Sequence, residues 1–153
     1  MKIAEIMTKI VITVDADSSI TEVAKTLFEN RIHAVPVLES GELAGIITET
    51  DFFTKGAVNI YLPGYIELIK DGVMSKSGTS VQKEHVRKLL DAKARDIMSF
   101  PCVSVREDED VNEFMDIVRE QNLNSVPVLN DSGLVVGIIT LVDVINLVKI
   151  NKI

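Results

Sequence analysis

The 153-residue chain has no tryptophan, one cysteine and two histidines, and aromatic residues make up only 5% of it. It therefore lacks the aromatic stacking platforms on which proteins bind single-stranded nucleic acid. The single Cys102 excludes an internal disulfide. Its position in an apolar run predicts a buried, reduced thiol, which is typical of a cytoplasmic protein.

Positive charge is also scarce, with 16 lysine and arginine residues against 23 acidic ones and a formal net charge of −7. This balance argues against broad binding to nucleic acid or acidic membranes. No apolar stretch is long enough to span a membrane, and the N-terminus has no signal-peptide pattern. We therefore expect a cytoplasmic protein of one compact unit, with no nucleic-acid and no membrane partner.

Common catalytic motifs are missing as well. The sequence has no G-x-x-x-x-G-K-[ST] loop, no H-E-x-x-H and no Cys/His cluster. The acidic run Glu107–Asp110 precedes a predicted helix, where a solvated capping segment is a simpler interpretation than a metal site. We expect no catalytic residue, no metal and no required cofactor.

One pattern of three segments occurs twice. Met98 follows Met7 by 91 positions and Asp143 follows Asp51 by 92, so the copies differ by one inserted residue. Two copies are too few for a solenoid, which favours a pair closed on itself. The segments are Glu5–Thr8, Ala34–Leu38 and Gly45–Asp51 in the first copy, and Asp96–Ser99, Ser125–Leu129 and Gly137–Asp143 in the second.

Each copy is predicted to run strand, helix, strand, strand, helix. In the first copy the β-branched run Ile10–Val14 predicts a buried strand. Ser19–Glu22 is a capping box before an amphipathic helix with Ile20, Val23, Ala24, Leu27 and Phe28 on its apolar face. Two apolar strands, Ala34–Leu38 and Leu43–Ile47, then predict a hairpin.

Two further expectations concern the ends of these strands. Pro36 cannot donate to a ladder, which indicates an edge strand or an irregularity. Thr48 is expected to start the closing helix. The second copy has the matching elements, namely a strand at Cys102–Val105, a helix capped by Asp110, hairpin strands at Ser125–Leu129 and Leu134–Ile139, and a closing helix over Leu141–Ile150.

The expected fold class is α/β (α+β), with two pseudo-symmetric β-α-β-β-α repeats forming one intramolecular pair. The repeats are 1–53 and 95–153, joined by a linker or helical insertion over 54–94. A connection of this length is unusual inside a compact domain. Within it, Tyr65–Ile69 predicts a helical turn, Val81–Ala94 a helix and His85 a solvated histidine.

Thr48-x-x-Asp51 and Thr140-x-x-Asp143 have two interpretations. Threonine followed three residues later by an acidic residue is a capping box, which needs no ligand. Yet the motif recurs where a strand meets a helix N-terminus, a position that suits phosphate. A carboxylate there can accept both hydroxyls of a ribose, and the apolar runs upstream could wall a flat base.

The whole pattern resembles the CBS domain, named after cystathionine β-synthase, in a tandem pair. The resemblance covers about residues 4–53 and 95–149. It implies a regulatory module, active in energy sensing, that binds AMP, ADP, ATP or S-adenosylmethionine in two clefts. Some members of the family bind NAD or cyclic di-adenylate. The resemblance also implies that the chain forms a homodimer.

The resemblance assigns roles to particular residues. Ribose binding falls on Asp51 and Asp143, and ribose or phosphate binding on Thr48 and Thr140. His33 is a phosphate candidate; its counterpart in the second copy is Asn124, which suggests unequal clefts. Lys55, Lys76 and Arg95 are further cations that could reach phosphate. The adenine pocket falls on Ile10, Ile12, Ala34, Pro101, Val103 and Ser125.

Two other functions stay open at this point. One is a ligand-free module for protein interaction or dimerisation, in which the motifs are only helix caps. The other, less favoured because catalytic candidates are few, is a small nucleotide hydrolase. The regulated protein is not identified by the sequence.

Overall fold

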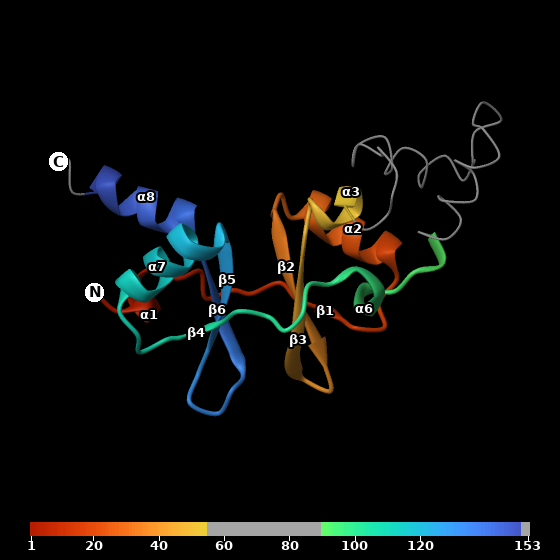
Figure 1. The fold of residues 1–153 in the computed structure, drawn as a ribbon, viewed down its shortest axis with the longest axis horizontal. Coiled ribbons are helices and arrows are strands. Elements are labelled where there is room, and N and C mark those ends of the chain that lie inside the picture. Colours follow the sequence, from red (N-terminus) through yellow and green to blue (C-terminus); the bar gives the residue numbers. More distant parts are fainter. Residues whose placement is uncertain (55–89, 151–153) are drawn as a thin grey trace. The chain divides into compact units, whose positions relative to one another are not determined.

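The computed structural model describes residues 1–54 and 90–150 (Figure 1). These residues form two three-stranded sheets, ordered β1-β2-β3 and β4-β5-β6. In chain order the elements are α1 (Ile3–Ile6), β1 (Val14–Asp15), α2 (Ile20–Glu29), β2 (Ala34–Glu39), β3 (Glu42–Thr48), α3 (Asp51–Thr54), α6 (Ala94–Ile97), β4 (Val105–Arg106), α7 (Val111–Gln121), β5 (Ser125–Leu129), β6 (Val135–Thr140) and α8 (Leu141–Ile150). The helices expected at Tyr65–Ile69 and over most of Val81–Ala94 lie outside the described residues.

Both sheets have the same construction. A two-residue strand pairs in parallel with the middle strand, with Val14 opposite Val37 in one sheet and Val105 opposite Val128 in the other. The middle strand and the strand after it form the predicted hairpin. In the first hairpin Ser40 and Gly41 both have positive φ, 52° and 80°, as a tight two-residue turn requires.

Pro36 lies in the middle strand of its sheet, so the first of the two alternatives, an edge strand, is wrong. The short neighbour β1 pairs only with Val37 and Leu38. Pro36 therefore lies outside the part of β2 that is paired on both sides, where a missing N–H is tolerated.

The expected first strands are also wrong in extent. Most of Ile10–Val14 and Cys102–Val105 is irregular, and only Val14–Asp15 and Val105–Arg106 are strands. β-propensity alone supplies no ladder partner, and within these two runs only Val14 and Val105 face a middle strand. The closing helix of the first copy begins at Asp51 rather than Thr48, because Thr48 is the last residue of β3.

The helix caps agree with the sequence. Ser19 Oγ accepts from the Glu22 amide at 3.1 Å, and the Glu22 carboxylate accepts from the Ser19 amide at 3.3 Å. Asp110 accepts from the Asn112 amide at 3.0 Å at the start of α7. On α2, Ile20, Val23, Ala24 and Leu27 are buried as expected, whereas Phe28 is 50% exposed.

The chain forms two compact units that do not follow the repeats. Among the described residues, one unit contains 13–39, 44–54 and 90–101, and is called the β1–β3 unit; the other contains 1–12, 40–43 and 102–150, and is called the β4–β6 unit. Ile97, from the start of the second repeat, and Ala94, which directly precedes that repeat, pack in the core of the β1–β3 unit. Ile3 and Met7, from the start of the first repeat, pack in the core of the β4–β6 unit. The segment at the start of each repeat, Ile3–Thr8 or Ala94–Ser99, is called its entry segment. Each entry segment thus completes the core built by the other repeat.

Ion pairs fix the second entry segment to the β1–β3 unit. The Arg95 guanidinium donates to Asp17 Oδ1 at 2.8 Å and to Glu39 Oε1 at 2.9 Å. Arg95, one of the candidate phosphate cations, is therefore already held by two carboxylates. Its hydrogen bond and charge hold the pKa of Asp17 below its ordinary value of 3.8.

Arg95→Gln is expected to lower the free energy of unfolding at neutral pH, and to do so less in acid. Because the pKa of Asp17 is depressed in the folded state, its contribution is present above the unfolded value of 3.8 and is lost as pH falls through the folded value. Urea unfolding of both proteins from neutral pH to below about pH 4 measures this. A difference between them that does not shrink in acid would contradict the pairing.

Candidate functional site

The two aspartates of the repeated motif are held in the same way. Asp51 is the first residue of α3, and Asp143 lies in the first turn of α8. Asp51 Oδ2 accepts from the Thr48 amide at 2.8 Å, and Asp143 Oδ2 accepts from the Thr140 amide at 2.7 Å. The structure thus brings each predicted threonine and aspartate together and fixes one carboxylate oxygen of each pair.

The threonine hydroxyls differ between the two pairs. Thr140 Oγ1 donates to Asp143 Oδ2 at 2.9 Å. Thr48 Oγ1 lies 2.7 Å from Thr50 Oγ1 and 3.4 Å from Asp51 Oδ2. The residue matching Thr50 in the second copy is Val142, which has no hydroxyl to compete. Asp51 is also only 6% exposed, whereas Asp143 is half-buried, so the two carboxylates are not equivalent.

Thr8 and Ser99 are site residues that sequence reasoning missed. Thr8 Oγ1 donates to Asp143 Oδ1 at 3.4 Å, and Ser99 Oγ donates to Asp51 Oδ1 at 3.4 Å. Each is the hydroxyl residue that follows Ile-Met at the start of a repeat. A signal was present, because this segment recurs with the Thr-x-x-Asp motif, but the sequence did not connect a hydroxyl to the aspartate of the other repeat.

Backbone pairing holds these entry segments in place. Thr8 and Ile138 exchange hydrogen bonds of 2.9 and 3.0 Å, and Ser99 and Ile46 exchange bonds of 2.9 and 3.2 Å. The preceding methionines, Met7 and Met98, lie against the glycines of β6 and β3. The glycine before Ile-Ile-Thr therefore makes room for a methionine of the opposite repeat.

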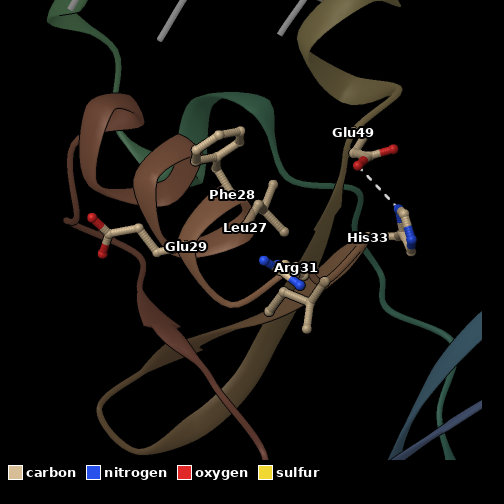
Figure 2. Close-up of a pocket in the computed structure, with 7 residues that line it drawn as sticks. Leu27, Phe28, Glu29, Arg31, His33 and Glu49 are labelled. Atoms are coloured by element: carbon tan, nitrogen blue, oxygen red, sulfur yellow. Dashed lines mark hydrogen bonds and ion pairs between the residues drawn. The ribbon is translucent and has the colours of Figure 1, made fainter. Parts of the chain in front are cut away.

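His33 lies beside the first site, at the rim of a cavity of about 450 Å³ (Figure 2). Its Nδ1 is 3.0 Å from Glu49 Oε1, and its ring is largely exposed. The Glu49 amide donates to the His33 carbonyl at 3.3 Å, which ties the histidine to the Thr48–Asp51 segment. Arg31 also lines the cavity and has a positive φ of 52°, uncommon for arginine. The other lining residues are Leu27, Phe28, Glu29, Ile32 and Glu49.

The residues predicted to surround adenine are distributed over both units. The β1–β3 unit contains Ala34 and Pro101, and the β4–β6 unit contains Ile10, Ile12, Val103 and Ser125. Ser125 pairs directly with Thr140, so it is close to the second site. Ile10 is 87% exposed and belongs to no strand. Lys55, Lys76 and His85 lie outside the described residues.

The acidic run Glu107–Asp110 and Cys102 are the other candidate residues for metal binding or catalysis. In the acidic run, Asp108 pairs with Arg106 at 3.2 Å and Asp110 caps α7. Cys102 is half-buried rather than fully buried, and burial raises the pKa of its thiol to about 11. A protonated thiol at neutral pH is a poor nucleophile. Among residues 1–54 and 90–150, no helix is long and apolar enough to cross a membrane.

Two sheet-and-helix units with matching Thr-x-x-Asp sites define the chain as a paired-repeat module. The sequence model of the CBS domain matches residues 3–57 and 94–150, and the chain belongs to the CBS domain family. The resemblance drawn from the sequence and the two-repeat fold class are both confirmed.

The chain is 28% identical over 151 residues to the uncharacterized protein MJ1426 of Methanocaldococcus jannaschii, covering 95% of this chain and 89% of that protein. It is similar to the CBS domain pair of protein MJ0100, solved in complex with 5′-methylthioadenosine and S-adenosyl-L-methionine. That match has 25% identity, a TM-score of 0.70 and coverage of 99% and 98% of the two chains.

A second solved structure is the CBS domain of a CBS domain containing membrane protein from Sphaerobacter thermophilus. It is 30% identical, with a TM-score of 0.73 and coverage of 96% of this chain and 87% of that one.

Proposed function

We propose that this protein is a regulatory module that binds adenosine-containing ligands at Asp51 and Asp143. It acts in the cytoplasm as a homodimer, without catalysing a reaction, and reports the ligand to a separate protein. The observation that carries the proposal is the fixed carboxylate of each Thr-x-x-Asp pair. One oxygen of each is held at 2.7–2.8 Å by a threonine amide.

A carboxylate held in this way suits a ribose. The amide bond to Oδ2 keeps the carboxylate in one orientation, so a ligand does not have to order it. The second oxygen, Oδ1, then faces a hydroxyl at a distance of 3.4 Å in both sites. A ribose diol can supply two hydroxyls to one carboxylate, and charged acceptors give the stronger hydrogen bonds.

The ligand class is supported by the MJ0100 structure, which contains 5′-methylthioadenosine and S-adenosyl-L-methionine. For this chain we propose the same class, extended to AMP, ADP and ATP. The adenine would lie against the residues assigned to it above. His33 is the proposed phosphate contact of the Asp51 site. Its partner Glu49, at 3.0 Å, carries a negative charge that opposes an incoming phosphate.

A thermal-shift panel tests the ligand class. The ligands are 5′-methylthioadenosine, S-adenosylmethionine, AMP, ADP, ATP and 2′-deoxy-AMP, with GTP as the base control. A ligand at one hundred times its dissociation constant stabilises the fold by about 2.7 kcal/mol, a clear shift. We expect adenosine ligands to give this shift and 2′-deoxy-AMP to give a smaller one than AMP.

Variants locate the working site. Asp143→Asn or Asp51→Asn should weaken binding roughly 10- to 100-fold, as expected for loss of a hydrogen bond to a charged group. Asp116→Asn removes the same charge from an exposed position of α7 and should leave binding unchanged. His33→Asn, which copies the second repeat, should weaken only phosphorylated ligands. Equal binding by both site variants and the Asp116 control would contradict the proposal.

The ligand-free interaction module is favoured by a separate observation. Helix α8 has an exposed apolar stripe, with Val142, Ile145, Val148 and Ile150 each at least 54% exposed. Such a stripe is typical of a surface that contacts another protein. If no panel ligand shifts nucleotide-free protein, while its mass in sedimentation rises with concentration, dimerisation becomes the preferred function. Release of phosphate from ATP by the pure protein would instead favour the hydrolase.

A further inference from the structure

Each aspartate receives its second hydrogen bond from the opposite repeat. Thr8, at the start of the first repeat, donates to Asp143 across 135 sequence positions. Ser99, at the start of the second repeat, donates to Asp51 across 48 positions. Both bonds end on Oδ1 and both measure 3.4 Å. The same contact therefore occurs twice, each time within one compact unit.

The two oxygens of each carboxylate are held with different strength. Oδ2 accepts a short bond from a backbone amide, at 2.7 Å in Asp143 and 2.8 Å in Asp51. Oδ1 accepts a long bond from a side-chain hydroxyl, near the limit for a hydrogen bond. In Asp143, Oδ1 is therefore the oxygen at which an incoming hydroxyl displaces an existing bond at least cost. The hydroxyl that it would displace belongs to an entry segment.

The displaced residue is part of a larger contact. Thr8 also pairs through its backbone with Ile138, and Met7 packs against Gly137. Ser99 and Met98 make the matching contacts with Ile46 and Gly45. A hydroxyl that takes over Oδ1 therefore removes one of three adjacent contacts that hold the entry segment to its edge strand.

We propose that the Thr8 hydroxyl occupies the Asp143 oxygen that faces the ligand, and that a vicinal diol displaces it. This proposal rests on the proposed function. Occupation of Asp143 loosens the segment that begins the first repeat, so this site signals to the opposite repeat.

If the ligand displaces the Thr8 hydroxyl, then removing this hydroxyl should increase the affinity for the ligand. Thr8→Val keeps the side-chain shape and removes the competing donor. Because a net hydrogen bond corresponds to a small free energy, the dissociation constant for 5′-methylthioadenosine should fall roughly threefold to tenfold at the Asp143 site. Thr8→Ser keeps the hydroxyl and should bind as the wild type does.

The deciding experiment combines calorimetric titration of 5′-methylthioadenosine with amide hydrogen exchange of the full chain. In the wild type, saturating ligand should speed exchange at the Thr8 and Ile138 amides, which hold the segment. In Thr8→Val, ligand should bind more tightly and change this exchange little. The wild-type exchange measurement needs no variant, so it decides the proposal even if Thr8→Val folds poorly.

Three outcomes overturn the proposal. Unchanged or weaker binding by Thr8→Val shows that the hydroxyl anchors the segment or contacts the ligand directly. Unaltered exchange at Thr8 and Ile138 in saturated wild type shows that occupancy does not reach the segment. In both cases the protein still binds, so the proposed function stands. Absence of binding by the wild type to this ligand and to AMP overturns both.

Discussion

Replacing Ile3 by alanine is expected to lower the free energy of unfolding by about 2–5 kcal/mol, as for other large-to-small changes in a core. Ile3 lies in α1, a helix of only four residues. Yet its side chain is 0% exposed and belongs to the core of the β4–β6 unit. Because α1 is too short to be stable by itself, packing must hold it there.

Urea unfolding of Ile3→Ala measures this effect, and Ile10→Ala is its matched control. Ile10 is the same residue type, seven positions later, and is 87% exposed. Its truncation should change stability by no more than about 0.5 kcal/mol. Hydrogen exchange should show that Ile3→Ala loosens β5 and β6, which come from the opposite repeat. Equal losses of stability in the two variants would contradict the packing of the first entry segment in the core of the β4–β6 unit.

Gly45→Ala is expected to destabilise the protein by about 1–3 kcal/mol, the usual effect of overpacking. A Cβ at Gly45 would lie 2.7 Å from Met98 Sδ and 2.9 Å from the Ser99 carbonyl oxygen. The methionine can move, but the carbonyl is part of the backbone pairing with Ile46. Chemical denaturation of the variant gives the value.

Gly137→Ala is the matched comparison, and its cost should be smaller. Its nearest neighbours are only side-chain atoms of Met7, which is flexible. Adding Met7→Ala to Gly137→Ala should therefore give a clearly favourable coupling in a double-mutant cycle. Adding Met98→Ala to Gly45→Ala should relieve less, because the Ser99 carbonyl remains. Equal relief in both cycles would show that the backbone contact does not limit the site.

Local features of the fold could be predicted because their causes lie within a few residues. The Ser19–Glu22 cap needs only neighbouring amides, and the turn at Ser40 and Gly41 needs only two positive φ angles. The Thr-x-x-Asp pairs are also local features. The threonine and the aspartate are three positions apart, and the threonine amide donates to the carboxylate in both copies.

Errors arose where a local preference needed a distant partner. The run Ile10–Val14 has strong β-propensity, but only its last residue, Val14, has a neighbouring strand to pair with. Pro36 was tolerated in a middle strand because β1 is only two residues long. Both outcomes depend on the length of another element, and neither the run nor the proline contains that information.

The sequence by itself determined a tandem CBS pair, two sheets with capped helices and two aspartates beside two threonines. Only the tertiary structure decided which entry segment completes which core. Glu5–Thr8 and Asp96–Ser99 have nearly the same pattern, so either would fit either sheet as far as the sequence shows. The choice comes from long-range packing, which placed Thr8 on Asp143 and Ser99 on Asp51. Contacts between residues so far apart form only when the whole chain has closed, because local hydrogen bonds and periodicity do not reach that distance.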